Sequence, residues 1–258
     1  AMTSLILTEK NLAHVKRNLL ESLDAFVKSS QLSEALAAAL GYRTHSALLA
    51  ALKSMDANDP DIVLLQEKPF LSRLKDFGFQ ANDEDEEIGF FDFLRIKEQG
   101  VVIKTYCPSS EEYPMVSKRH KAWRNLMVAT VNAGLEQKLF SLREDDNRWP
   151  NAKDREAYVY EFEFLNRPVV ASVSDIGFGE LSIHAAFNPT PQGKRFVRAA
   201  NAGFSAGDAF AACWLERKRG AWLQCYFHSL KIRKSILNDL SGAEITPKGF
   251  GDRGRTIM

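Results

Sequence analysis

The sequence predicts an α+β fold, in which an N-terminal helical bundle precedes a mixed domain with an antiparallel meander packed by helices. Apolar residues recur at three- and four-residue steps within residues 7–52 and 117–139, which is the spacing of amphipathic helices. Apolar and polar residues alternate within residues 158–164 and 181–187, which is the pattern of half-buried strands. An acidic run between the first helices and these later elements divides the chain in two.

Three helices are predicted at the N-terminus. The first covers residues 7–29, with Thr8 as a weak N-terminal signal. The second begins near Ser33 and ends at Gly41, a residue type that favours the conformation found just beyond a helix. Thr44 can cap the third. This layout fits a helix-turn-helix or any small bundle. Its acidic surroundings and small apolar side chains favour packing or dimerisation over DNA reading.

Asn82 is followed by five consecutive acidic residues, which repel one another and favour a solvated segment. A short helix over residues 69–77 precedes them. We therefore expect three parts: a helical module in 1–80, an acidic linker in 81–89 and an α+β domain in 90–258.

The α+β domain is expected to start with two strands and to contain a three-stranded meander between helices. Ser117 is placed to begin the first of these helices, and the sequence from Ser205 to Asp208 resembles a capping box for the second. The glycine-rich tail from residue 241 is predicted to be irregular. The expected strands are 90–96, 101–106, 158–164, 169–174 and 181–187, and the expected helices are 117–139, 209–219 and 224–240.

Composition indicates a globular protein of the cytoplasm. The 258 residues contain only three cysteines, a poor basis for a disulfide framework. No run of about 18 apolar residues is present, so no membrane partner is expected. A signal-peptide pattern is also lacking at the start of the sequence.

Charge is distributed unevenly along the chain. Of 34 Lys and Arg residues, 11 lie in residues 1–100 and 23 in 101–258, whereas the 33 Asp and Glu residues divide into 16 and 17. The net charges are therefore −5 and +6. Such asymmetry is typical of a polyanion-binding half, and it also arises where two halves of a chain attract each other.

Basic residues of the second half are interleaved with aromatic residues, a combination that suits contact with nucleic-acid backbones and bases. Cations near helix ends or on solvated faces are the alternative interpretation. Residues 248–251 match the first four positions of an RNA-recognition consensus and then depart from it, which favours a flexible basic tail. The candidate nucleic-acid-binding residues are Lys118, Arg119, Lys121, Arg124, Arg217, Lys218, Arg219, Trp222, Lys231, Arg233 and Lys234.

Catalytic residues are harder to identify. Glu161 and Glu163 share one face of a predicted strand and could hold Mg²⁺, but no third ligand stands at a recognisable spacing, which favours a solvated strand face. His184 and Ser182 also share a strand face but lack the third group of a triad. The spacing of cysteines and histidines matches no zinc site, and the glycines match no dinucleotide or phosphate loop, so neither metal nor cofactor is expected.

The segment from Ala35 to Leu52 contains the pattern Ala-x-x-x-Ala-Leu-Gly-Tyr-x-Thr followed by leucines. This pattern resembles a short helical module near the ends of functionally uncharacterised bacterial proteins, many of them carried by plasmids, phages and integrative elements. The resemblance implies a bacterial, mobile-element origin and no particular activity. We expect a non-enzymatic interaction protein that binds a protein partner or itself through residues 30–55. A nucleic-acid-binding accessory protein and an enzyme with an unfamiliar site are the alternatives.

Overall fold

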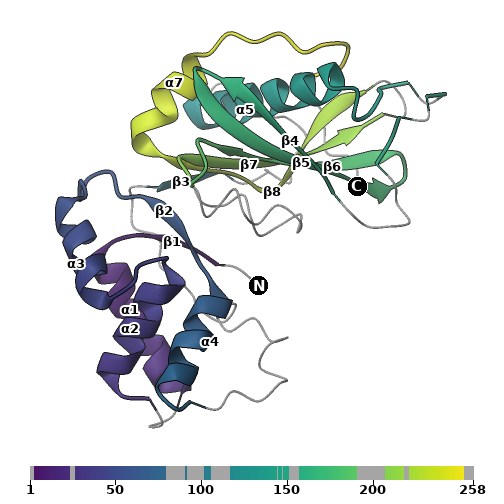
Figure 1. The fold of residues 1–258 in the computed structure, drawn as a ribbon. Helices are drawn as coiled ribbons and strands as arrows, with labels where there is room; N and C mark the ends of the chain where they lie inside the picture. Colours follow the sequence, from purple (N-terminus) through teal and green to yellow (C-terminus); the bar gives the residue numbers. More distant parts are fainter. Residues whose placement is uncertain are drawn as a thin grey trace. The chain divides into compact units, whose positions relative to one another are not determined.

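The chain forms two compact units, Ala1–Val101 and Val102–Met258, and each is described by itself (Figure 1). The first unit extends past the predicted linker, because Phe91 packs edge-on against Phe70 with ring centroids 5.0 Å apart. The acidic run itself lies outside the described residues. The computed structural model describes residues 3–23, 27–79, 91, 102–105, 117–143, 145–146, 148–150, 157–190, 207–217 and 221–252.

The N-terminal unit is a set of helices beside a small sheet. The predicted caps are present: the Thr8 and Thr44 hydroxyls accept from the N–H groups of Asn11 and Ala47, and Gly41 has a φ of +84° just beyond the second helix. The boundary between the first two helices differs from the prediction, because the first ends at Ser22 and the second already begins at Ser29. The two-stranded antiparallel sheet was not predicted. The elements are β1 (Thr3–Ile6), α1 (Glu9–Ser22), α2 (Ser29–Ala39), α3 (His45–Ser54), β2 (Ile62–Leu65) and α4 (Glu67–Asp76).

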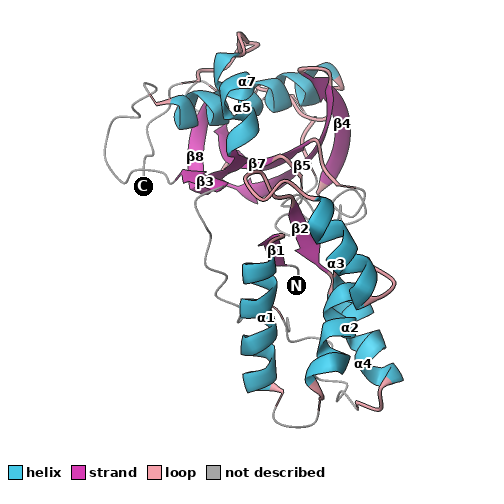
Figure 2. Cartoon of the chain, turned by 90° about the vertical axis from the view of Figure 1, so that its left-hand side faces the viewer, coloured by secondary structure: helices cyan, strands magenta, loops and turns pink. Residues whose placement is uncertain are grey.

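The C-terminal unit is a six-stranded antiparallel sheet with helices on one face (Figure 2). The strand order is β3-β8-β7-β6-β5-β4, so β4 to β8 form a meander and β3 joins the far edge beside β8. The elements are β3 (Val102–Thr105), α5 (Lys118–Glu136), β4 (Tyr158–Phe164), β5 (Arg167–Gly177), β6 (Glu180–Phe187), β7 (Ala209–Glu216), β8 (Trp222–Arg233), the 3₁₀ turn η2 (Lys234–Ile236) and α7 (Leu237–Gly242).

The predicted α+β class, helix-first order and meander are confirmed, and two predicted helices are wrong. The strand β7 lies within the first of them, 209–219, and β8 occupies most of the second, 224–240, of which the end is helical in η2 and α7. Phe210, Cys213 and Trp214 have helical spacing, but on the strand Cys213 faces the core, whereas Phe210 and Trp214 lie on the opposite face of β7. Asp208, which looked like part of a helix cap, is a buried carboxylate at the start of β7.

Helix α5 is held between the sheet and a C-terminal strap, which we define as residues 243–252. The Trp123 Nε1 donates to the carbonyl of Ala212 in β7 at 2.8 Å. On its other side, the buried Asn125 amide donates to the carbonyls of Leu240 and Ala243. The strap is irregular, as predicted, but it is fastened along α5, and Phe250 at its end is buried in the core.

Candidate docking groove

An apolar hollow of about 320 Å³ opens between α1, α2 and α3 of the N-terminal unit. Leu36 and Leu48 form buried parts of it, whereas Leu49 is 39% exposed. These side chains come together because α2 and α3 are joined by the short turn at Gly41, α2 packs on α1, and all three helices contribute to one core. The lining residues are Glu9, Leu12, Ala13, Lys16, Ser33, Leu36, His45, Leu48, Leu49 and Leu52.

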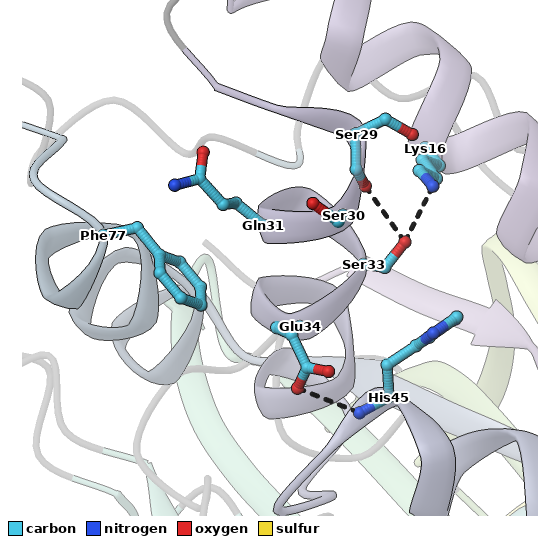
Figure 3. Close-up of a pocket in the computed structure, with 8 residues that line it drawn as sticks. All are labelled: Lys16, Ser29, Ser30, Gln31, Ser33, Glu34, His45 and Phe77. Carbon is cyan, nitrogen blue, oxygen red and sulfur yellow. Dashed lines mark hydrogen bonds between the residues drawn. The ribbon is translucent and has the colours of Figure 1, made fainter.

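A second, polar hollow of about 610 Å³ adjoins the first and shares Lys16, Ser33 and His45 with it. Figure 3 shows how its side chains surround the start of α2. The Lys16 ammonium donates to the Ser33 hydroxyl at 2.7 Å, and this hydroxyl donates to the Ser29 carbonyl at 3.1 Å. The two hollows, which we call the docking groove, therefore run from a leucine-lined end to a polar end.

The polar end of the docking groove favours negative charge. The first N–H groups of α2, at Ser29 and Ser30, carry the positive end of the helix dipole, and Lys16 adds a full charge. Glu34 is held by the His45 N–H at 3.0 Å and lies 3.9 Å from the Arg73 guanidinium, so its charge is already compensated. A ligand with an apolar body and an acidic end matches this arrangement.

Several predicted nucleic-acid-binding residues are instead engaged in internal contacts. Arg124 binds the strap through Asp252 at 2.6 Å and the Ile245 carbonyl at 2.7 Å. Arg233 pairs with the buried Asp208 at 2.8 Å. Their guanidinium groups therefore hold the fold together.

Arg217 is also engaged: its guanidinium lies 3.9 Å from the Trp149 ring centroid and donates to the Arg143 carbonyl at 3.1 Å. Lys231 lies on β8 opposite Phe210. Trp222 opens β8, but its side chain is outside the description, as are Lys218 and Arg219.

Lys118, Arg119 and Lys121 are exposed in the first turn of α5. The Lys118 ammonium donates to the Asn238 side chain at 2.8 Å, so the start of α5 lies beside α7, a few residues after the exposed Lys234. The structure thus brings Lys118, at the start of α5, near the segment that contains Lys234.

The candidate catalytic residues do not form one site. Glu161 and Glu163 are exposed on the edge strand β4, whereas His184 is buried on β6 with β5 between them. Burial lowers the pKa of His184 to about 4, and its ring stacks on Phe210 at 5.9 Å. The His184 imidazole is neutral and enclosed, and it lies away from both carboxylates. These three side chains therefore cannot act together on one substrate.

No group of three or more His, Cys, Asp or Glu side chains among the described residues could hold a metal ion. None of the helices described is long and apolar enough to cross a bilayer. Phe250, the aromatic residue of the partial RNA-recognition consensus, is buried and cannot stack on a base.

Comparisons of the chain with protein-family models, curated proteins and solved structures give no match. The docking groove therefore has to be interpreted from its own residues. The sequence prediction of a partner surface at residues 30–55 includes α2 and α3 but misses the contribution of α1. One signal was present: Leu48, Leu49 and Leu52 make an apolar face wider than a single buried stripe.

Proposed function

We propose that this chain is a non-enzymatic binding protein whose docking groove holds a short amphipathic segment of a protein partner. The observation that carries the proposal is the continuity of a leucine-lined hollow with an electropositive one on three helices. Helix-in-groove recognition uses such a surface, in which apolar anchors enter the groove and charged neighbours set the direction.

The charges along α1 define the direction of the bound segment. Glu9 lines the leucine-lined end and Lys16 lies at the junction with the polar end, and seven residues of helix separate them by about 10 Å. A helical segment of two to three turns with a basic residue near Glu9 and an acidic residue near Lys16 fits this pattern.

A peptide selection tests the proposal. Random helical peptides displayed on phage are selected for binding to the full chain. The chain carries Phe178→Asn, a change in the C-terminal unit, outside the docking groove. Enriched sequences are expected to share apolar residues at i, i+3 or i+4, and i+7, with an acidic residue at one end. Their affinity, measured by calorimetry, should fall about 30-fold in Leu49→Glu, the loss typical of a hot-spot residue.

The matched control is Leu165→Glu, because Leu165 is 40% exposed and Leu49 is 39% exposed, but Leu165 lies in the C-terminal unit. This variant should bind the selected peptides as tightly as the parent. Failure to enrich any peptide, or equal binding to the Leu49→Glu variant, would rule out the docking groove.

A second candidate function is nucleic-acid binding by the exposed cluster at the start of α5, favoured by its approach to the helix after Lys234. A low-salt gel shift with DNA should show binding whose salt slope falls by about three when Lys118, Arg119 and Lys121 become alanine. The control replaces the exposed Lys10, Lys53 and Lys68, which changes net charge equally. Absence of salt-sensitive binding would end this alternative.

Residues 35–52 resemble a module of bacterial mobile-element proteins. This resemblance supports the same cellular setting for partner binding and for nucleic-acid binding. The protein would act in the cytoplasm as an accessory of such an element, with its cysteines reduced. Cys213, which is free and buried beneath α5, is consistent with that setting.

A further inference from the structure

The turn between β5 and β6 presents an aromatic side chain to solvent. Phe178 is 89% exposed, while no other large apolar side chain among the described residues exceeds 41%. Ile176, two residues earlier on the same hairpin, is 40% exposed. A lone exposed apolar residue needs no explanation, but a nearly bare ring at a hairpin tip is placed to enter a partner.

The backbone of this turn is poorly suited to phenylalanine. Gly177 pairs with Glu180, so Phe178 and Gly179 form a two-residue turn, with φ angles of 58° and 78°. Both positive values define a type I′ turn, whose first position favours asparagine, aspartate or glycine. A bulky side chain in this conformation is strained. The phenylalanine thus lowers stability at a site where it contacts little of its own fold.

The base of the same hairpin is acidic. Asp175, Glu180 and Glu216 are half-buried around the last rungs of β5, β6 and β7. Arg217, whose N–H donates to the Gly179 carbonyl at 3.1 Å, directs its guanidinium to Trp149 instead. An apolar tip with an acidic collar fits an apolar hollow that is bordered on one side by Lys16 and the start of α2.

We propose that the Phe178 turn of one copy of the chain inserts into the docking groove of a second copy. The ring would occupy the leucine-lined end, at the lower limit of ligand-pocket volumes of about 300 Å³, and the acidic collar would face Lys16, His45 and the start of α2. A tip and a complementary hollow on one chain create self-association, either a reciprocal dimer or an open chain of copies. This inference rests on the proposed function, since it names an occupant of the same groove.

Sedimentation velocity over about a hundredfold range of protein concentration tests the inference. The mass of the wild-type chain is expected to rise with concentration. In Phe178→Asn the dissociation constant should rise about 30-fold, while the midpoint of thermal unfolding of the C-terminal unit rises by about 2 to 4 °C because the strain is relieved. Weaker association in a more stable variant separates lost contact from lost folding.

Leu165→Asn is the matched control. Leu165 and Asn166 form a second two-residue turn with positive φ angles, 52° and 57°, in the hairpin between β4 and β5. The substitution should stabilise the chain in the same way and leave its self-association unchanged.

A mixing experiment identifies the two surfaces. Phe178→Asn retains an intact groove and Leu49→Glu retains an intact tip, so an equimolar mixture should form a complex although neither variant associates alone. A constant monomer mass for the wild type, equal weakening by Leu165→Asn, or no complex on mixing would each overturn the inference. The peptide selection uses the Phe178→Asn variant. It can therefore detect peptide binding to the docking groove even when sedimentation shows no self-association.

Discussion

Replacing Asp208 with alanine is expected to lower the free energy of unfolding of the C-terminal unit by about 3 kcal/mol, because it removes a buried carboxylate that pairs with the largely buried Arg233. One oxygen of this carboxylate accepts from Arg233 at 2.8 Å. The other accepts from Arg167 at 2.9 Å and from the Asn188 amide at 2.7 Å. These groups belong to β5, the loop after β6 and the end of β8, so a single side chain joins the ends of four neighbouring strands.

Urea unfolding followed by tryptophan fluorescence measures this effect, since all four tryptophans of the chain lie in the C-terminal unit. Asp208→Asn, which retains an acceptor but not the charge, should fall between the wild type and alanine. Asp145→Ala removes a carboxylate from the exposed pair with Arg143 and should have no measurable effect. An unchanged urea midpoint in Asp208→Ala would show that the cluster contributes nothing.

Acid is expected to destabilise the C-terminal unit through His184. Burial lowers the pKa of this imidazole from 6.5 to about 4. Between these values the unfolded chain binds a proton that the folded chain does not, so the free energy of unfolding decreases as pH falls through this range. The loss is complete below about pH 4 and is of the order of 3 kcal/mol.

The measurement is the free energy of unfolding from tryptophan fluorescence at a series of pH values between about 7.5 and 4. Because carboxylates also titrate near the lower limit, the informative quantity is the difference between the wild type and His184→Gln. This difference in the free energy of unfolding should change by the whole loss expected for His184 across the pH range. The pH dependence of His45→Gln, a change in the N-terminal unit, should match that of the wild type. A parallel pH dependence of wild type and His184→Gln would contradict the expectation.

Elements set by local signals were predictable from sequence. Thr8 and Thr44 cap helices through bonds to residues three positions on, and strands β4 to β6 follow one another through short turns. Each of these interactions lies within a few residues of its cause. The pattern of nearby side chains was therefore enough to predict the starts of α1 and α3 and the first three strands of the meander.

Elements that depend on distant partners were not predictable. The strand β1 pairs with β2 some sixty residues later, so Thr3 faces Leu65, and neither short apolar run shows alternation. In β7, the helical spacing of Phe210 and Trp214 concealed a strand whose neighbours are β6 and β8. Propensity gave way to tertiary pairing in both cases.

The same limit applies to the candidate sites. Arg124 and Arg233 looked like free cations because their partners, Asp252 and Asp208, lie far away in the sequence. The docking groove was foreseen only in part, since Leu12 and Lys16 of α1 join it through packing that no local pattern records. Phe178 lies between the predicted strands 169–174 and 181–187, and its exposure became evident only in the structure.

The edge position of β3 has a consequence for the order in which the protein matures. Val102 pairs with Arg233, so β3 and the apolar face of α5 leave the ribosome well before the strand that completes their sheet. Until that strand and the strap arrive, the growing chain presents Trp123 and the inner faces of β4 to β6 to its surroundings. Such long-range closure makes folding slow and concentrates the risk of aggregation during synthesis. Chaperone dependence would therefore belong to the C-terminal unit, while the helices that line the docking groove are complete earlier in synthesis.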